Sequence, residues 1–285
     1  MAGVDIARIR AHGSAGIGDL TMGRIDKRLD GRVCVVAGVL GTMGEAVARR
    51  FAQEGGIVVG IDRLPHAIGQ LSLQLDLADE AAVQDGFERV MRNFGRLDVL
   101  YNNAGPIDPE DHSALDDSVD TWNRVLSSIL TTTWLACKHA IPHMLKAASP
   151  NGSVINTSSF LVGMGSASAQ MAFNAAKAGV EQLSRDLGVQ LARSGVRVNA
   201  IAMGPIQTPQ IKATFDKLGD EQVARRFIHM PMGRFGTPDE LAATAAYLAS
   251  DDAGFVTASA FPLDGGISQA FTVPETKPHR PGSDA

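Results

Sequence analysis

One stretch near the start of the chain, residues 32–62, restricts the possible folds more than any other. It contains an apolar, β-branched run at 32–37, a glycine-rich turn, a helical pattern at 45–55 and a second apolar run at 57–62 that ends in an acid. Strand, turn, helix and strand in this order make a βαβ unit, whose strands pair in parallel through a right-handed crossover. The stretch therefore predicts an α/β fold built on a parallel sheet.

The same alternation continues along the rest of the chain. We expect further strands at residues 71–77, 97–103, 153–156, 196–202 and 261–264, further helices at 80–94, 120–146, 172–192 and 238–250, and a helical flap at 205–237. This order predicts a single doubly wound parallel sheet, Rossmann-like and flanked by helices. The domain would span residues 31–271, between an N-terminal arm at 1–30 and a proline-rich, polar, flexible tail at 272–285.

Charge and composition exclude several kinds of partner. The net charge of −5 provides no basic field for nucleic acid. The two cysteines, Cys34 and Cys137, offer neither a disulfide framework nor a metal site. No apolar run reaches the ~18 residues of a membrane span, and residues 1–16 lack the apolar core of a signal peptide. We expect a cytoplasmic protein that binds small molecules and neither nucleic acid nor a membrane.

The turn at residues 37–44, AGVLGTMG, joins the first strand to the first helix. Such a turn gathers backbone N–H groups and the positive end of a helix, where a pyrophosphate binds. The residues expected to hold the nucleotide there are Gly38, Gly41, Thr42, Met43 and Gly44. Asp62 ends the second strand and is placed to accept hydrogen bonds from an adenosine ribose and to repel a 2′-phosphate. NAD is therefore the expected cofactor, with Arg63 as the counter-argument and a simple turn or capping role as the alternative for Asp62.

Five short motifs follow the turn in order. They are Asp76 with Leu77, Asn102-Asn103-Ala104-Gly105, Gly204-Pro205 with Thr208, Gly233-Arg234-Phe235-Gly236, and Leu263-Asp264-Gly265-Gly266. Through them the chain resembles the short-chain dehydrogenase/reductase family over residues 30–268. The resemblance implies that Asp76, Leu77, Asn103, Ala104 and Gly105 lie on the adenine side of the cofactor site, and that Gly204, Ile206 and Thr208 belong to the segment that closes over nicotinamide.

The resemblance is irregular at the expected active site. The family has a serine, a tyrosine and, four residues after the tyrosine, a lysine; here these positions hold Ser159, Phe173 and Lys177. A fourth position, seven residues after Trp122, holds Ile129 where the family has an asparagine that helps to hold a proton-relay water. Phenylalanine cannot exchange a proton, and isoleucine cannot hold that water. Only Ser159 and Lys177 keep the usual chemistry.

The glycine turn also departs from the family pattern. Ala37 stands where the family has a threonine, and Thr42 stands where it has its second glycine, with Gly41 one place earlier. Thr42 adds a branched side chain at a point where a phosphate or ribose would lie close to the backbone. We therefore expect this substitution to weaken cofactor binding.

Each remaining candidate has a functional and a structural interpretation. By resemblance Ser159 orients a substrate oxygen, but this serine, or Ser158, is equally suited to capping the end of a strand. Lys177 shares a helix face with Phe173 and by resemblance reaches the nicotinamide ribose; an ordinary surface lysine is the alternative. A charged group follows the Asn-Asn-Ala-Gly motif, consisting of Asp108, Glu110, Asp111 and His112. These residues form either a solvated loop or a source of a new acid or base.

The residues leave three functions open. The first is an NAD(H)-binding oxidoreductase that acts on a hydroxyl or ketone, in which water, Ser159 or a loop group moves the proton. The second is a non-redox enzyme on the same scaffold, such as a cyclase, isomerase or lyase. The third is a catalytically inactive protein that binds NAD or a partner subunit. Phe173 and Ile129 favour the last two, whereas Ser159, Lys177 and Asp62 favour retained function.

The expected substrate is small and hydrophobic, alicyclic or terpenoid. Ten apolar side chains fall on segments that would border the pocket: Phe160, Leu161, Val162, Met164, Met171, Phe173, Ile206, Ile211, Phe215 and Met230. By resemblance we also expect a homotetramer, paired through the helices at 120–146 and 172–192. Small alanines at 172, 175, 176 and 178 would permit close approach of such helices.

Overall fold

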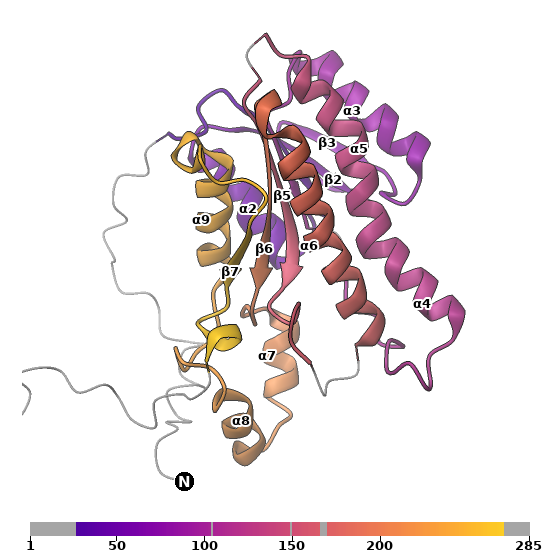
Figure 1. The fold of residues 1–285 in the computed structure, drawn as a ribbon, viewed down its shortest axis with the longest axis vertical. Helices are drawn as coiled ribbons and strands as arrows, with labels where there is room; N and C mark the ends of the chain where they lie inside the picture. The colour runs from indigo at the N-terminus through magenta and orange to yellow at the C-terminus, as the bar shows by residue number, and fades with distance from the viewer. Residues whose placement is uncertain (1–26, 104, 149, 166–169, 271–285) are drawn as a thin grey trace, which may run out of the picture.

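The computed structural model describes residues 27–103, 105–148, 150–165 and 170–270. Within them, seven parallel strands form one sheet in the order β3-β2-β1-β4-β5-β6-β7. They are β1 (Val33–Ala37), β2 (Ile57–Asp62), β3 (Leu71–Gln74), β4 (Val99–Asn102), β5 (Gly152–Ser159), β6 (Val196–Met203) and β7 (Ala260–Leu263). The strands therefore end together at one carboxyl edge, at the bottom of Figure 1, and begin together at one amino edge. The predicted doubly wound parallel sheet is confirmed, while the expected tail and residues 1–26 of the expected arm lie outside the described residues.

Helices cover both faces of the sheet. One face carries α3 (Glu80–Phe94), α5 (Thr132–Leu145) and α6 (Met171–Leu191), and the other carries α2 (Thr42–Gln53) and α9 (Pro238–Ala249) (Figure 1). Each layer buries an apolar cluster, with Phe87 in the first and Phe51 in the second. Successive strand residues such as Val35 and Val36 enter opposite clusters. This double burial explains the continuous apolar runs seen in the sequence.

The helix expected at residues 120–146 is divided into three segments. α4 (Val119–Leu126) leads into a π-helical turn (Ser127–Thr131), which is followed by α5. The hydroxyl groups of Thr132 and Thr133 donate to the Ile129 carbonyl at 3.2 and 2.7 Å. Such side-chain bonds compete with the regular backbone ladder of a helix. The apolar periodicity does not record these bonds, so the sequence predicted one continuous pattern.

Three strands, β3, β4 and β5, differ most from those expected, while β1, β6 and β7 are displaced by only one residue. β5 pairs with β6 along its full length and reaches Ser159, three residues beyond the expected end. β3 ends at Gln74 rather than at residue 77, because the carboxylates of Asp76 and Asp79 accept hydrogen bonds from the backbone N–H groups that follow them. β4 is also shorter than expected. The extension of β5 matters most, since it places Ser159 at the carboxyl edge.

The region expected to form a helical flap contains α7 (Pro209–Phe215) and α8 (Asp220–Phe227). Three phenylalanine rings join these helices to the segment that follows. The ring centroid of Phe235 lies 4.8 Å from those of Phe215 and Phe227, which are 5.8 Å from each other. Aromatic pairs at such distances stabilise a small cluster beyond the burial of their area. The flap thus has an apolar cluster of its own, below the sheet in Figure 1.

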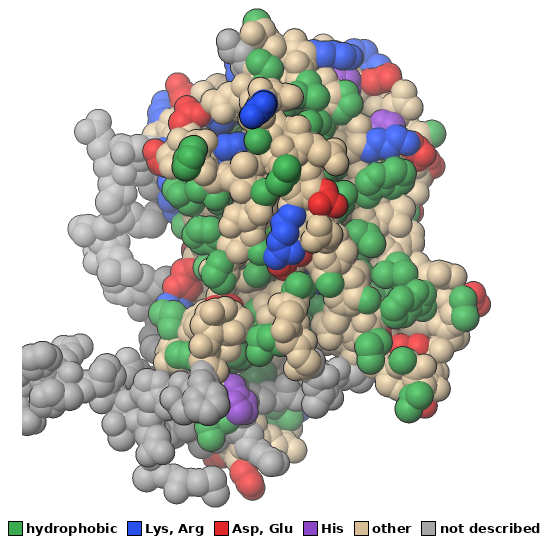
Figure 2. Space-filling model, viewed as in Figure 1, with side chains coloured by type: hydrophobic (Ala, Val, Ile, Leu, Met, Phe, Trp, Pro, Cys, Tyr) green, Lys and Arg blue, Asp and Glu red, His purple; other side chains and the backbone are tan. Residues whose placement is uncertain are grey.

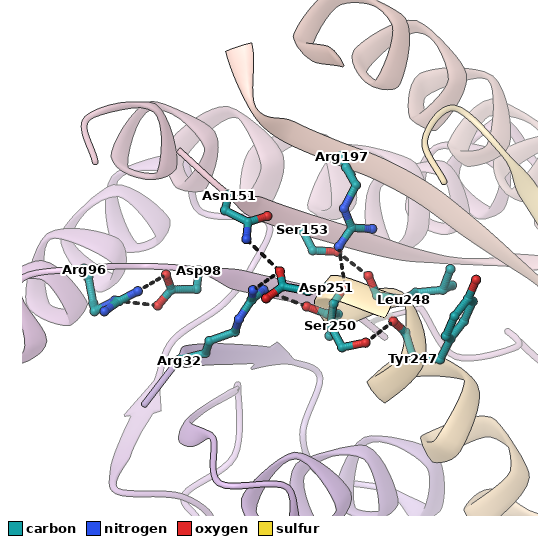
Figure 3. A network of polar contacts seen from close by, with 11 residues as sticks. Arg32, Arg96, Asp98, Asn151, Ser153, Arg197, Tyr247, Leu248, Ser250 and Asp251 are labelled. Atoms are coloured by element: carbon teal, nitrogen blue, oxygen red, sulfur yellow. Dashed lines mark hydrogen bonds and ion pairs between the residues drawn. The ribbon is translucent and has the colours of Figure 1, made fainter. Parts of the chain in front are cut away.

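Polar side chains fasten the amino edge of the sheet to the end of α9 (Figure 3). Arg32, immediately before β1, pairs with Asp251. Ser153 in β5 donates to the Leu248 carbonyl at 2.9 Å, and Arg197 in β6 donates to a carbonyl in the turn after α9 at 3.0 Å. The bonds of Ser153 and Arg197 are buried, whereas the Asp251 carboxylate is exposed. Together these contacts tie three strands to one helix end.

A cavity of about 390 Å³ opens at the same edge. Its wall includes Arg96, His143 and Lys146, which follow or lie within the last turns of α3 and α5. Cations at helix C-termini complement the exposed carbonyl groups there. The basic lining of this cavity therefore has a structural explanation.

In the described part of the chain, no helix combines the length and apolar character needed to cross a membrane. No three His, Cys, Asp or Glu side chains of those residues gather as a metal site would require. Cys34 and Cys137 are both buried and unbonded to each other. Burial raises the pKa of each thiol, that of Cys137 to about 12, so neither is a reactive thiolate at neutral pH.

Candidate active site

The glycine turn lies at the carboxyl edge, between the ends of β1 and β2 and the start of α2. The N–H groups of Gly38 and Val39 donate to the Ile61 carbonyl at 2.8 and 3.1 Å. Gly38 and Gly41 have positive φ angles of 79° and 115°, which residues with side chains rarely adopt. A Cβ atom on Gly44 would lie 2.2 Å from the Gly38 carbonyl oxygen. Glycine is therefore needed at all three positions for the helix to meet the turn.

The start of α2 lacks the side-chain cap that several other helices of the described chain have. Its N-cap residue, Gly41, provides no side-chain hydrogen bond, whereas α3, α4 and α9 begin with side-chain caps. A Cβ atom on Gly41 would meet no heavy atom within 4 Å, so space remains beside the turn. Uncapped N–H groups and the helix dipole suit a phosphate. The turn, with half-buried Thr42 and Met43 beside it, fits the pyrophosphate of a dinucleotide.

Asp62 and Asn103 hold the turn from two sides. The Asp62 carboxylate accepts a hydrogen bond from the Leu40 N–H at 2.9 Å, and the Asn103 amide donates to the Gly38 carbonyl at 3.1 Å. Asp62 is half-buried at the end of β2, where an acid meets the adenosine ribose in dinucleotide-binding folds. The structure thus shows the turn-bracing role of Asp62, and the ribose-binding role stays a prediction.

The other residues expected on the adenine side have different environments. Asp76 is exposed and accepts a hydrogen bond from the Ala78 N–H at 2.9 Å, whereas Leu77 is buried in the apolar cluster beneath α3. Gly105 has a φ of 116°, and a Cβ atom on it would lie 2.7 Å from Cγ1 of Ile129. Ala104 lies outside the described residues. Gly105 is thus required by its close approach to the π-helical turn.

Lys177 is buried one helical turn after Phe173 in α6. Its ammonium group donates to the Thr157 carbonyl at 2.9 Å and lies 5.6 Å from the centroid of the Phe173 ring. Burial lowers the pKa of Lys177 to about 8, because water no longer solvates the charged form. The surface-lysine interpretation is wrong, since only 5% of this residue is exposed.

The two serines at the end of β5 face different neighbours. The Ser159 hydroxyl accepts a hydrogen bond from the Leu161 N–H at 3.2 Å, as a strand-end cap does. The Ser158 hydroxyl donates to the Glu181 carboxylate at 3.1 Å and lies 3.3 Å from the Lys177 carbonyl, so it is committed to α6. Ser159 is therefore the better placed of the two to meet a ligand, and its single backbone bond leaves its own proton available for donation.

Phe173 and Ile129 belong to one apolar cluster. Ile129 is fully buried there with Ala172 and Val180, and the half-buried Phe173 packs against them. The two residues expected to depart from the family pattern thus contact the same group of side chains. The Ile129 carbonyl accepts the Thr133 hydroxyl at 2.7 Å, so part of its hydrogen-bonding capacity is occupied within the helix.

The acids of the loop after β4 are held by other protein groups. Arg124 binds Asp108 at 2.8 Å and Glu110 at 2.7 Å, and this guanidinium keeps the pKa of Asp108 below its ordinary range. The Asp111 carboxylate accepts two backbone N–H groups at the start of α6, and His112 is exposed. The solvated-loop interpretation is wrong for Asp111, whose role no local sequence signal indicated because its partners are 61 and 62 residues away.

The segment expected to close over nicotinamide follows β6. A Cβ atom on Gly204 would lie 2.6 Å from Cα of Asp264, and Thr208 caps α7 by accepting the Ile211 N–H at 3.2 Å. Ile206 is buried and forms a bridge with Gly236. These contacts fix the segment against the end of β7 and the loop before α9.

Some of the ten expected pocket residues face elsewhere. Phe215 and Met230 pack within the apolar cluster of the flap, and Ile206 is 3% exposed. Phe160, Leu161 and Val162 are half-buried after β5, while Met164 and Met171 are exposed. Phe215, Met230 and Ile206 thus pack within the protein, whereas the residues after β5 and at the start of α6 keep part of their apolar surface exposed.

Comparisons with known proteins agree with this geometry. A short-chain alcohol dehydrogenase profile described as enoyl-(acyl carrier protein) reductase matches residues 38–268. The chain belongs to the short-chain dehydrogenase/reductase family. Members of this family are oxidoreductases that use a nicotinamide cofactor, and the matched segment contains the glycine turn, Ser159 and Lys177.

Two relatives and one solved structure illustrate the family match. The chain is 38% identical over 249 residues to cis-4-hydroxycyclohexanecarboxylate dehydrogenase of Sinomonas cyclohexanicum, covering 83% of this chain and 96% of the relative. It is 34% identical over 253 residues to 2,5-dichloro-2,5-cyclohexadiene-1,4-diol dehydrogenase of Sphingobium indicum, covering 85% and 98%. Its fold matches ligand-free aldohexose dehydrogenase of Thermoplasma acidophilum with a TM-score of 0.77, at 27% identity and over 89% and 99% of the two chains.

Proposed function

We propose that this chain is an NAD(H)-binding oxidoreductase that acts on the hydroxyl or ketone of a small hydrophobic, alicyclic substrate. In this proposal the site keeps the serine and lysine of its family, but Phe173 occupies the position of the tyrosine that exchanges the proton. The observation that carries the proposal is the pair Lys177 and Phe173, with the buried ammonium 5.6 Å from the centroid of the ring. A hydride site of this family would therefore retain its lysine and lack its phenol.

The preference for NAD(H) rests on Asp62. Its carboxylate binds the glycine turn through the Leu40 N–H and would lie at the 2′ side of an adenosine ribose, where it can accept hydrogen bonds and repels a phosphate. When bound, the nicotinamide would accept or give up the hydride. The turn, Asn103 and the segment from Gly204 to Thr208 would hold and orient the nucleotide.

The substrate class is supported by two independent features. The segment after β5 and the start of α6 carry apolar side chains that are partly or largely exposed, namely Leu161, Met164 and Met171. The names of two relatives describe dehydrogenases of ring alcohols, a hydroxycyclohexane carboxylate and a cyclohexadiene diol. A cyclic secondary alcohol would bury its ring on the apolar surface and direct its hydroxyl to Ser159.

Proton transfer in this site would fall to the groups that remain. The acids of the β4–α4 loop already bind Arg124 or the backbone at the start of α6. They are therefore poor substitutes for the missing tyrosine as a proton donor. Ser159 has a hydroxyl near the substrate position, and Lys177 titrates near pH 8, within the range useful for acid–base chemistry. We therefore propose that Ser159, or water held near Lys177, transfers the proton to or from the substrate oxygen. A positioned general acid contributes about 10²–10⁴ in rate, so the reaction would be slow.

A second candidate is a non-redox or inactive member of the family. The shared apolar cluster of Ile129 and Phe173 favours it, because both changes remove polar groups from one place. Under this alternative the nucleotide would bind without transferring a hydride. The experiment below separates the two candidates.

The test restores the missing phenol. Phe173→Tyr should raise the oxidation of a cyclic secondary alcohol with NAD by up to about 10²–10⁴, and adding Ile129→Asn should raise it further. Ile129→Asn alone is the matched control, because it adds polarity to the same cluster without a proton donor. Equal rates for wild type and Phe173→Tyr would show that a group other than residue 173 transfers the proton. Turnover of the substrate that forms no NADH in any variant would support the non-redox alternative.

We also propose that the chain forms a homotetramer through α4, α5 and α6. Hydrophobic side chains gather over α4 and the adjoining part of α5 in Figure 2, and they include exposed Val119, Trp122 and Trp134. Of the alanines expected at this interface, Ala172 is buried within the subunit, while Ala175 is exposed. Light scattering should give four times the 30.0 kDa chain mass; a monomer at micromolar concentration would exclude this assembly.

A further inference from the structure

The start of α6 is capped by a residue from a distant loop. Gln170, the N-cap residue, makes no side-chain capping bond. Instead the two carboxylate oxygens of Asp111 accept the N–H groups of Ala172 at 2.9 Å and Phe173 at 2.8 Å. Asp111 is 2% exposed. A buried carboxylate that meets two N–H donors at a helix N-terminus makes a strong, charge-assisted cap.

The loop that contains Asp111 is itself fixed at its other end. Arg124 in α4 binds both Asp108 and Glu110. The loop after β4 is therefore held between α4 and the start of α6, which lie next to each other in Figure 1. One loop thus connects the end of β4, where Asn103 contacts the glycine turn, to the helix that carries Phe173 and Lys177.

We propose that Asp111 is a positioning residue of the active site, which sets the place of residue 173 by holding its backbone N–H. This inference rests on the proposed function, because it assigns the bond a part in the same reaction. Asp111 would not contact the substrate or the reacting atoms. It would fix the first turn of α6, and through that turn the distance of the residue-173 ring from Lys177 and Ser159.

The geometry gives this bond more than a stabilising role. The N–H that Asp111 accepts belongs to the very residue whose ring lies beside the Lys177 ammonium. The same ammonium also donates to the Thr157 carbonyl at 2.9 Å. If the first turn of α6 loosens, the ring moves and water reaches the ammonium, which raises the pKa of a lysine that burial had lowered. Displacement of a reacting group by about 1 Å can cost about 10² in rate.

The test compares Asp111→Ala and Asp111→Asn with Asp98→Ala. Asp98 accepts the Val33 N–H at 2.8 Å and pairs with Arg96 at the amino edge, so its loss removes similar bonds far from the site. Asp111→Asn keeps one acceptor oxygen and serves as the variant that folds if Asp111→Ala does not. The first measurement is the titration of the Lys177 side chain by nuclear magnetic resonance. The second is kcat and KM in the Phe173→Tyr background.

Both Asp111 variants should raise the pKa of Lys177, by about one unit for Asp111→Ala, and should lower kcat by roughly 10–100-fold with the KM for NAD unchanged. Asp98→Ala should change neither quantity. An unchanged Lys177 titration and kcat in both Asp111 variants, or the same shift in Asp98→Ala, would overturn the proposal and leave Asp111 as a helix cap only. If no variant turns over at all, the proposed function fails, but the Lys177 titration still decides the role of Asp111.

Discussion

The two edges of the sheet are built in opposite ways. At the amino edge, side chains such as Arg32, Ser153 and Arg197 are bound to carbonyls or carboxylates of another element (Figure 3). At the carboxyl edge, α2 begins without a side-chain cap, and the buried Lys177 has a lowered pKa. One edge is held by many internal bonds, with the buried Arg197 Nε as an unpaired atom among the described residues, and the other keeps groups that a ligand would complete.

This contrast separates stability from function within one sheet. In open parallel sheets, ligands bind outside the carboxyl ends of the strands, so groups at that edge are arranged for a ligand at some cost to the fold. The amino edge has no such task and can satisfy its polar groups internally. Substitutions at the two edges should therefore affect different measurements, and the following three predictions test this division.

The largest expected effect on stability comes from Lys177→Met. Burial lowers the pKa of Lys177 from its ordinary 10.5 to about 8, so at neutral pH the fold carries the cost of a buried charge, at most about 3 kcal/mol. Between about pH 8 and 10.5 the folded chain releases this proton while the unfolded chain retains it, so the free energy of unfolding rises with pH. Lys177→Met should be more stable than wild type at pH 7 and should lose that part of the pH dependence.

Chemical denaturation at several pH values measures this difference. Lys217→Met, which removes an exposed lysine between α7 and α8, is the matched control and should leave both the stability and its pH dependence unchanged. A destabilised Lys177→Met variant would show that the carboxyl edge contributes stability. That result would contradict the proposed difference between the two edges of the sheet.

An intermediate effect is expected from Asp62→Ser. Removing the carboxylate should weaken NAD binding by roughly 10-fold and strengthen NADP binding by a similar factor, because one charged hydrogen-bond acceptor and one repulsive charge are lost. Wild type should bind NAD(H) more tightly than NADP(H). Calorimetric titration of both nucleotides measures the change, and tighter NADP(H) binding by wild type would contradict the assignment.

The smallest effect is expected from Ser153→Ala at the amino edge. The variant leaves the Leu248 carbonyl without its buried donor and should lower the free energy of unfolding by about 1–2 kcal/mol. Nucleotide affinity and turnover should stay as in wild type. A change in either would mean that the two edges are coupled through β5.

The sequence predicted most of the fold and named residues for a candidate site. Apolar runs and glycine turns are local signals, so β2 and α3 begin and end where expected, whereas the roles expected of Asp62, Ser159 and Lys177 stay predictions. The boundaries that failed depend on side-chain hydrogen bonds, such as those of Thr132 and Thr133 to the Ile129 carbonyl. Such bonds leave no periodic pattern.

Contacts between residues far apart in the chain were the other feature that the sequence did not predict. Asp111 and the start of α6 are separated by the whole of α4 and α5, so no spacing rule connects them. The burial of Lys177 likewise depends on how α6 packs against β5, which a helical pattern alone does not fix. The expected pocket wall was only partly right for the same reason, since Phe215 and Phe235 meet only after the flap folds.

The most direct test of the central claim is a single turnover with NAD and cis-4-hydroxycyclohexanecarboxylate, followed by the appearance of NADH in wild type and Phe173→Tyr. The claim is that the carboxyl edge binds the nucleotide and can pass a hydride but lacks the phenol. It predicts the same NAD occupancy in both proteins and NADH formation that is up to about 10²–10⁴ faster in Phe173→Tyr. Full NAD occupancy with no NADH from either protein would contradict it.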